Sequence, residues 1–485
     1  MHILVRTCFT FLFALNALAH DHHDELTEEE TSAPIDNILW IHILLQSLVW
    51  GVIFPIGMVL GLSRSRWHVP LQVTGYALTV GGYILGHSHK GRAFLAGVHG
   101  KFANILIVPI LGQLAVGIYL KLHINEKSIR PYIVTLHGII GKAYPIFGWA
   151  QILFGFIAFR GYCRGGALGQ CLAHYIMGSG FIAYSVMMTI ILLVGEQWIR
   201  RSGRSPEFFD SVVITLWVRT VSFCIVNTFT EHHGGAWSVK DMQHTIMGVL
   251  WWTGGILGIF LSRNNQRNVV PGIIIFLTGW GMSGHAQALM ISTQVHAMFG
   301  YTLMLAGLTR ILEVCFFAPS FAVDAADDDN RSEHTLADGA GARPQAQQSA
   351  KAAASRSFRF LPPFLLVAAG LLFMSATDEE LRYAHGLELD HVTYILSVFS
   401  MAFLLYAFIV SLVSLYSTSG RNAPGAAGGA GAIDERAIEL VSPRGAAKWY
   451  ARVPTQGAGP HAHVLGDDDE EEEEDMMAPH LSIRR

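Results

Sequence analysis

The sequence predicts an all-α, polytopic membrane protein with about eleven transmembrane helices. Three observations support this class. Hydrophobic residues make up 51% of the chain against 14% charged residues, apolar segments of spanning length recur along it, and its 23 histidines follow those segments in phase. This composition argues against a soluble globular protein. A net charge of −4 offers no basic surplus, so we expect no nucleic-acid partner.

The apolar segments justify the helix count. A hydrocarbon slab about 30 Å thick needs roughly 20 residues of helix to cross it. Segments close to this length cover residues 38–62, 69–87, 97–120, 132–158, 172–195, 210–229, 244–262, 269–284, 295–317, 359–376 and 391–417. Membrane lipid is therefore the expected surrounding, and the sequence gives no oligomeric state.

The ends of the chain and its linkers predict the topology. Residues 1–19 have the basic start, short apolar run and small-residue cleavage site of a secretory signal peptide, and residues 20–35 form a lumenal segment rich in histidine and acid. Residues 318–357 and the acidic tail 418–485 are expected to be disordered and cytosolic. The signal peptide and the positive-inside rule together place the amino terminus in the lumen or outside the cell. We expect an integral membrane protein of the secretory pathway: the endoplasmic reticulum, the vacuole or the plasma membrane.

The five cysteines show no zinc-ribbon or CxxC spacing, which argues against a thiolate metal site. Cys163 and Cys171 are close enough in sequence to form a disulfide if their loop faces an oxidising lumen. The paired and the free state both stay open at this point.

Four histidines lie near the amino-terminal ends of the first four segments: His42, His68, His99 and His137. Consecutive helices run antiparallel, so His42 and His99 lie toward the lumen while His68 and His137 lie toward the cytosol. Two imidazoles from facing helices can form the axial pair of a heme iron. A histidine that only bonds a neighbouring helix is the alternative, although the cost of an ionisable group in a span, on the order of 3 kcal/mol, favours function.

The segments that carry these histidines also share further motif residues. In order, they read His42-x7-Trp50-Gly51-x3-Pro55-x-Gly57, His68-x3-Gln72-x2-Gly75-Tyr76, His99 with Gln113, and His137-x3-Gly141 with Gln151-x3-Gly155. This arrangement over residues 36–160 resembles the cytochrome b561 family. The resemblance implies a four-helix bundle with two b-type hemes, one held by His42 with His99 and one by His68 with His137, and one-electron transfer across the membrane.

Glycines are frequent in the same four segments. They could admit a flat macrocycle against the backbone or allow tight helix packing, and both interpretations stay open. The glycines concerned are Gly51, Gly57, Gly75, Gly81, Gly82, Gly141, Gly148 and Gly155.

Residues 170–317 contain a degenerate second copy of this bundle. His244-x7-Trp252 repeats the His42 motif, and His296 repeats His99. The position that matches His68 is Asn268 or Val269, so the copy keeps at most the pair His244 and His296 and at most one further heme. Two more helices follow in residues 358–417. The tandem arrangement resembles fungal multi-pass membrane proteins of the Ytp type.

Other polar residues suggest an electron donor and an acceptor. Imidazoles suit a transition-metal ion, so ferric or cupric ion is the expected acceptor at the lumenal histidines His87, His89, His285, His232 and His233. An anionic donor such as ascorbate suits the cytosolic Arg64, Arg66, Lys127 and Arg130. The positive-inside rule explains these basic residues without any ligand. Arg310 and Glu313, three residues apart, are expected to pair.

The expected function is therefore transmembrane electron transfer by a b-type cytochrome, with ascorbate-dependent reduction of ferric or cupric ion on the lumenal face. Two alternatives stay open. One is a histidine-rich transporter of metal ions or protons, because internal repeats are common in transporters. The other is a heme-free structural membrane protein derived from the same fold. The sequence assigns no catalytic residue.

Overall fold

The computed structural model describes residues 31–221, 237–284, 287–317 and 358–423. All of them belong to one compact unit, Met1–Ala426. The predicted signal peptide, the disordered loop 318–357, nearly all of the tail 418–485 and the candidate ligands His232, His233 and His285 lie outside the described residues.

The described residues are helical, as the sequence predicts, and they form no strand; one isolated bridge joins Ile35 and Gly91. Each of the eleven predicted segments corresponds to one helix or, for the first, to two joined helices. The helices are α3 (Asn37–Leu48), α4 (Phe54–Leu62), α5 (His68–Ser88), α6 (Val98–Lys121), α7 (Arg130–Arg160), α8 (Leu168–Val194), α9 (Glu196–Ser202), α10 (Pro206–Val221), α12 (Val239–Leu261), α13 (Val270–Ser283), α14 (Met290–Leu312), α17 (Leu361–Ser375), α18 (Asp378–Gly386) and α19 (His391–Thr418).

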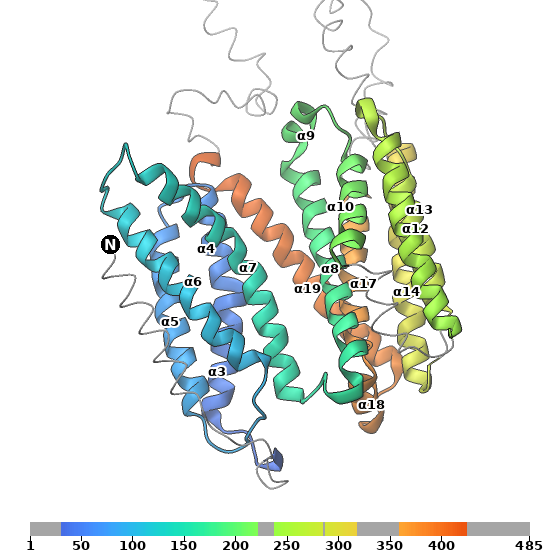
Figure 1. The fold of residues 1–485 in the computed structure, drawn as a ribbon, viewed down its shortest axis with the longest axis horizontal. Helices are drawn as coiled ribbons and strands as arrows, with labels where there is room; N and C mark the ends of the chain where they lie inside the picture. The colour runs from blue at the N-terminus through green and yellow to red at the C-terminus, as the bar shows by residue number, and fades with distance from the viewer. Residues whose placement is uncertain (1–30, 222–236, 285–286, 318–357, 424–485) are drawn as a thin grey trace, which may run out of the picture. The chain divides into compact units, whose positions relative to one another are not determined.

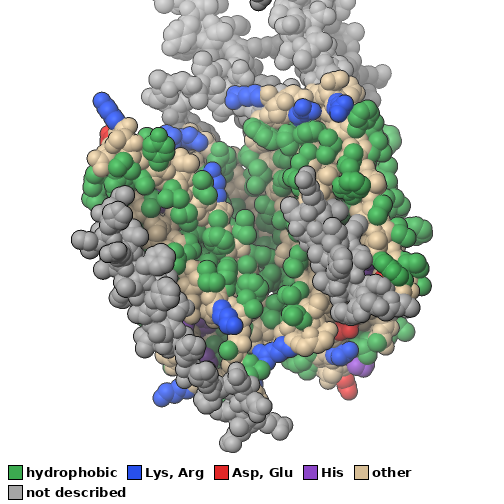
Figure 2. All heavy atoms as spheres, in the orientation of Figure 1, with side chains coloured by type: hydrophobic (Ala, Val, Ile, Leu, Met, Phe, Trp, Pro, Cys, Tyr) green, Lys and Arg blue, Asp and Glu red, His purple; other side chains and the backbone are tan. Residues whose placement is uncertain are grey.

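The surface is that of an integral membrane protein. Within the described chain, seven helical segments are long and apolar enough to cross a membrane, and the bent pair α17 and α18 adds an eighth if it counts as one span. Hydrophobic side chains cover the middle band of the face in Figure 2, and Lys and Arg side chains gather toward its two ends. Leu44 and Leu404 are among the outward-facing apolar residues, at 67% and 75% exposure. Exposed apolar side chains on this scale, together with the spanning helices, indicate a surface that contacts lipid.

The first bundle consists of α3 to α7, which run side by side in Figure 1. α3 packs on α5, α6 packs on α7, and α7 contacts α4. A π-helical turn, Val49–Ile53, joins α3 to α4 directly before Pro55. Proline has no N–H to donate to the preceding turn, so the helical ladder adjusts there. The adjustment buries Trp50 and Phe54 in the centre of the bundle.

The second bundle is built from α8, α10, α12, α13, α14 and α17. Its closest helix pair is α13 and α14, which cross at glycines: a Cβ on Gly279 would lie 2.5 Å from the carbonyl oxygen of Gly300. Only a small residue allows the backbones at this α13–α14 crossing to approach so closely.

Helix α19 packs on α8 and α17 and also on α4 of the first bundle. The hydroxyls of Ser63 and Ser419 lie 2.7 Å apart where α19 meets α4.

Cys163 and Cys171 form a disulfide between α7 and α8, which settles the alternative that the sequence left open. The loop is fixed to the start of α18, where Glu379 accepts the N–H of Cys163 at 2.9 Å and Glu380 accepts the hydroxyl of Tyr162 at 2.8 Å. Burial raises the pKa of Tyr162, and the Glu380 carboxylate raises it further. We call the end of the helices at which this bond lies the disulfide end.

Candidate functional site

His42 and His99 face each other near the disulfide end of the first bundle. Their ring centres are 6.3 Å apart, and the ring planes are nearly perpendicular, at 85°. Nδ1 of His42 lies 2.7 Å from the carbonyl oxygen of Gly82, and Nδ1 of His99 lies 3.3 Å from that of Gln151. The structure thus brings together the first pair that the sequence predicts.

His68 and His137 form the second predicted pair, near the opposite end of the same bundle. Their ring centres are 6.2 Å apart and the ring planes meet at 86°. Nδ1 of His68 lies 2.7 Å from the carbonyl oxygen of Gly57. Nδ1 of His137 is buried and has no hydrogen-bond partner among the described residues. The two pairs therefore share one geometry.

This spacing suits a metal ion between the rings. Metal–nitrogen bonds of about 2.0 Å, with roughly 1.1 Å from each nitrogen to its ring centre, put collinear rings about 6.2 Å apart. A carbonyl oxygen only accepts hydrogen bonds, so Nδ1 of His42, His68 and His99 carries the proton and the neutral ring keeps a lone pair on Nε2. Bis-histidine heme iron needs such lone pairs, so these residues fit the predicted cofactor.

The two pairs lie at different depths. His42 bonds the carbonyl of Gly82, fourteen residues beyond His68 on α5, and His99 bonds that of Gln151, fourteen residues beyond His137 on α7. At 1.5 Å per residue, His68 and Gly82 lie about 21 Å apart along α5, and His137 and Gln151 lie equally far apart along α7. The pairs therefore lie toward the two ends of the bundle, as the antiparallel order of the helices predicts.

Glycines leave room for the imidazoles of His42, His68 and His99. A Cβ on Gly86 would lie 2.6 Å from the His42 ring, one on Gly61 2.8 Å from the His68 ring, and one on Gly155 3.1 Å from the His99 ring. Of these three glycines, only Gly155 was among those singled out in the sequence; another of that set, Gly57, receives the side chain of Gln72. The glycines thus admit side chains from neighbouring helices. Gly81 is an exception, because no described atom lies within 4 Å of the place that a Cβ would take there.

A third histidine pair lies in the second bundle, and it includes a residue that the sequence did not pair with His296. His296 of α14 faces His174 of α8, with ring centres 5.7 Å apart and the two Nε2 atoms 3.5 Å apart. The expected partner of His296 was His244. That residue lies on α12, which packs on α10 and α13. The repeat pattern missed His174 because the matched motifs of the second copy begin only at His244, after α8.

The second copy replaces one histidine by a residue that keeps its structural contact. Asn268 donates to the carbonyl of Gly258 at 3.3 Å, the contact that corresponds to His68 with Gly57 in the first bundle. Asparagine has no imidazole nitrogen for a heme iron. The position that matches His68 therefore supports the fold and offers no heme ligand.

The predicted donor-binding residues border the His68–His137 pair. Arg64 and Arg66 come just before α5, and Lys127 and Arg130 lie at the start of α7. Arg130 lies 3.6 Å from Glu126, which also accepts from the exposed His123 at 2.7 Å. The hydrogen bond from His123 and the charge of Arg130 lower the pKa of Glu126.

The described candidates for metal binding, His87 and His89, lie at the end of α5. Nδ1 of His87 lies 3.0 Å from the carbonyl oxygen of Tyr83, and Nδ1 of His89 is buried without a hydrogen-bond partner in the described chain. Asp36 caps α3 beside them and accepts the N–H of Lys90 at 2.8 Å. This bond, together with one from Leu39, lowers the pKa of Asp36.

A buried charged cluster lies at the end of the second bundle away from the disulfide. Arg310 donates to Glu313 at 2.7 Å, as predicted, and also to Asp210 at 2.8 Å and Glu207 at 3.0 Å. Arg267 donates to Glu207 as well, at 2.7 Å. The sequence indicated only the local pair because the other partners come from α10 and from the loop before α13.

Comparison with known proteins assigns the chain to a family. A family model described as Protein YTP1-like, C-terminal matches residues 147–417, which is more than half of the 485 residues. The chain belongs to the YTP1-like family. A second model, a domain of unknown function (DUF2427), matches residues 22–123. The YTP1-like region contains the third histidine pair and the charged cluster, and the resemblance to Ytp-type membrane proteins is confirmed.

Three individual relatives come from yeasts, and two of them are named as membrane proteins. Protein YTP1 of Saccharomyces cerevisiae is 42% identical over 54% of this chain and 50% of its own length, so the match spans about half of that relative. The uncharacterized membrane protein C3B8.06 of Schizosaccharomyces pombe is 21% identical over 60% of this chain and 81% of its own length. The uncharacterized membrane protein YCR061W of S. cerevisiae is 24% identical over 58% of this chain and 49% of its own length. No solved structure matches the chain.

Proposed function

We propose that this YTP1-like protein is an integral membrane b-type cytochrome that moves single electrons between two hemes. The observation that carries the proposal is the presence of two histidine pairs of one geometry, with ring centres 6.3 and 6.2 Å apart and about 21 Å between them along the helices. Bound heme supplies the one-electron exchange between ferrous and ferric iron. The chain positions the two ligand sets at the two ends of its first bundle.

Backbone carbonyls prepare the histidines for this role. Gly82, Gly57 and Gln151 each accept an Nδ1–H, which orients the ring and directs the Nε2 lone pair toward the partner ring. Such hydrogen bonds also increase the basicity of an imidazole ligand. Glycines on the neighbouring helices leave the rings the room that they need.

An aromatic cluster lies between the two pairs. Trp50 and Phe54 have ring centres 4.9 Å apart, Phe54 and Tyr144 5.4 Å, and the hydroxyls of Tyr76 and Tyr144 lie 3.2 Å apart. His42 precedes Trp50 by eight residues and His68 precedes Tyr76 by eight, or about 12 Å along each helix. The cluster keeps the space between the pairs densely packed and excludes water from it.

The disulfide supports the proposed orientation. Disulfides persist in oxidising compartments, so the disulfide end faces the lumen or the outside of the cell. With that end outside the cytosol, the amino terminus is lumenal after signal cleavage and the carboxyl terminus is cytosolic. The protein belongs to a membrane of the secretory pathway.

In this orientation, a heme held by His68 and His137 would accept electrons at the cytosolic face. Arg64, Arg66 and Lys127 are exposed there and suit an anionic reductant such as ascorbate. A heme held by His42 and His99 would supply electrons to ferric or cupric ion on the lumenal side. His87 and His89, at the end of α5, are the described residues nearest in sequence to that exit.

Heme content tests this proposal. Replacing His68 by Ala removes one ligand of the cytosolic heme, so we expect the purified variant to retain one b-type heme of two, by pyridine hemochrome analysis. His385→Ala, at an exposed residue of α18, is the matched control and keeps both. Unchanged heme content in His68→Ala would refute the pairing, since the remaining pair lies at the other end of the bundle.

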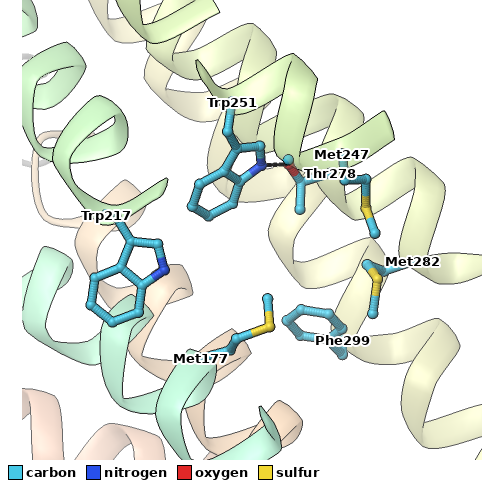
Figure 3. Close-up of a pocket in the computed structure, with 8 residues that line it drawn as sticks. Met177, Trp217, Met247, Trp251, Thr278, Met282 and Phe299 are labelled. Carbon is cyan, nitrogen blue, oxygen red and sulfur yellow. Dashed lines mark hydrogen bonds between the residues drawn. The ribbon is translucent and has the colours of Figure 1, made fainter. Parts of the chain in front are cut away.

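A second candidate function, transport of metal ions or protons, has support in the second bundle. Two cavities of about 20 and 40 Å³ share Met177, Trp217 and Trp251 in their walls, and Figure 3 shows these residues around the smaller one. The larger cavity reaches Tyr184, which lies near Asp210 of the charged cluster. These cavities lie between the third histidine pair and that cluster along α8. Flux of the ion into proteoliposomes, with heme content measured in the same sample, separates the two functions.

A further inference from the structure

The third histidine pair differs from the other two in spacing and enclosure. His174 and His296 are 8% and 4% exposed, whereas the rings of the first bundle are only half-buried. Phe373 stacks on His174 with ring centres 4.5 Å apart, and Phe299 packs on Phe373 at 4.6 Å. A heme placed between these rings would have to displace a closely packed core. The pair therefore suits a bare cation.

The hydrogen bonds of the pair call for a positive charge between its rings. Nδ1 of His174 lies 2.8 Å from the carbonyl oxygen of Gln170, and Nδ1 of His296 lies 2.8 Å from that of Ser292. In the neutral rings both Nδ1 atoms then carry the proton, and the two Nε2 atoms lie 3.5 Å apart. Either a shared proton or a metal ion bound by both Nε2 atoms stabilises this contact.

The distance also selects a coordination geometry. With metal–nitrogen bonds of about 2.05 Å, two nitrogens 3.5 Å apart subtend about 117° at the metal. This angle is close to trigonal or tetrahedral coordination and far from the straight line of axial heme ligation. Closed-shell Cu⁺ and Zn²⁺ ions adopt such geometries.

Methionine sulfurs near His174 and His296 favour Cu⁺ over Zn²⁺. Met177 follows His174 by three residues on α8 and Phe299 follows His296 by three on α14, so both lie one turn deeper on the same helix faces. Met177, Met247 and Met282 line the cavity of about 20 Å³ there, which has room for about one water molecule. Thioethers prefer Cu⁺, and the uncharged walls bury a monovalent ion at a lower cost than a divalent one.

We propose that His174 and His296 bind one Cu⁺ ion, with the methionine-lined cavity of Met177, Met247 and Met282 as its adjoining site. The site needs no heme and does not depend on the proposed electron transfer. It would deepen the second candidate function by naming the ion that enters the second bundle.

Copper binding at fixed free Cu⁺ tests this proposal. The full-length protein in detergent is dialysed without oxygen against Cu⁺ buffered by bathocuproine disulfonate, and copper per chain is counted by mass spectrometry. We expect the double variant His174→Gln/His296→Gln to bind one copper fewer than wild type. The control His385→Gln/His391→Gln changes exposed histidines and keeps the wild-type number. The difference between variants corrects for copper bound elsewhere on the chain.

Met177→Leu keeps both histidines and a similar side-chain volume, so it tests the cavity without removing the pair. We expect it to weaken Cu⁺ binding at least tenfold and to leave Zn²⁺ binding unchanged. Equal copper in wild type and the double histidine variant would overturn the proposal, and so would preferential loss of Zn²⁺. Heme content measured in the same samples separates failure here from failure of the electron-transfer proposal, because these variants leave the first bundle intact.

Discussion

The substitution Gly86→Ala probes the heme ligand His42 without changing any ligand. The added Cβ would lie 2.6 Å from the His42 ring, whereas ordinary contact begins at 3.4 Å, so the ring must move by about 0.8 Å. A functional site tolerates displacements of about 0.5 Å. The hydrogen bond from His42 to Gly82 also resists this movement. Overpacking of this kind costs about 1–3 kcal/mol.

Gly81→Ala on the same helix is the matched control, because no described atom lies within 4 Å of the added carbon. Alanine favours a helix over glycine by up to about 1 kcal/mol, so this variant should be at least as stable as wild type. We expect one b-type heme per chain in Gly86→Ala and two in Gly81→Ala, measured by pyridine hemochrome analysis of monodisperse protein. Two hemes with an unchanged spectrum in Gly86→Ala would refute the assignment of His42 as a ligand.

Three further predictions concern other parts of the structure. Cys163→Ser opens the disulfide loop and should lower stability by about 2.5 kcal/mol, measured by thermal unfolding without reductant. Arg310→Gln leaves buried acids unpaired and should cost about 3–5 kcal/mol, while Glu313→Gln should cost less because Arg310 keeps other acidic partners. The lowered pKa of Asp36 means that its bond to Lys90 stabilises the fold fully above the ordinary value of 3.8 and is lost as the pH falls through the folded pKa. The difference in melting temperature between wild type and Asp36→Asn should therefore shrink on acidification; a constant difference would contradict this reasoning.

The two pairs of the first bundle could be predicted because helix length and direction fix the depth of each residue. His42 and His99 lie near the starts of helices that run in the same sense, and so do His68 and His137. Equal depth in the membrane was enough to predict which histidines pair, and the structure shows the same pairs.

Which helices are neighbours in the second bundle could not be predicted in this way. His174 and His296 are 122 residues apart in sequence, and their contact depends on how α8 and α14 pack. Likewise, Arg310 and Glu313 share one helical segment, whereas Glu207 reaches them from α10. The periodicity of the sequence indicates contacts within a helix and the depth of a residue in the membrane. It does not indicate which helices lie next to each other.

The number of b-type hemes in the purified wild-type protein tests the central claim most directly. A reduced-minus-oxidised absorption spectrum, with pyridine hemochrome quantification per chain, should show b-type bands and two hemes, one for each histidine pair of the first bundle. A spectrum without b-type bands, from protein that is folded and monodisperse, would contradict the claim.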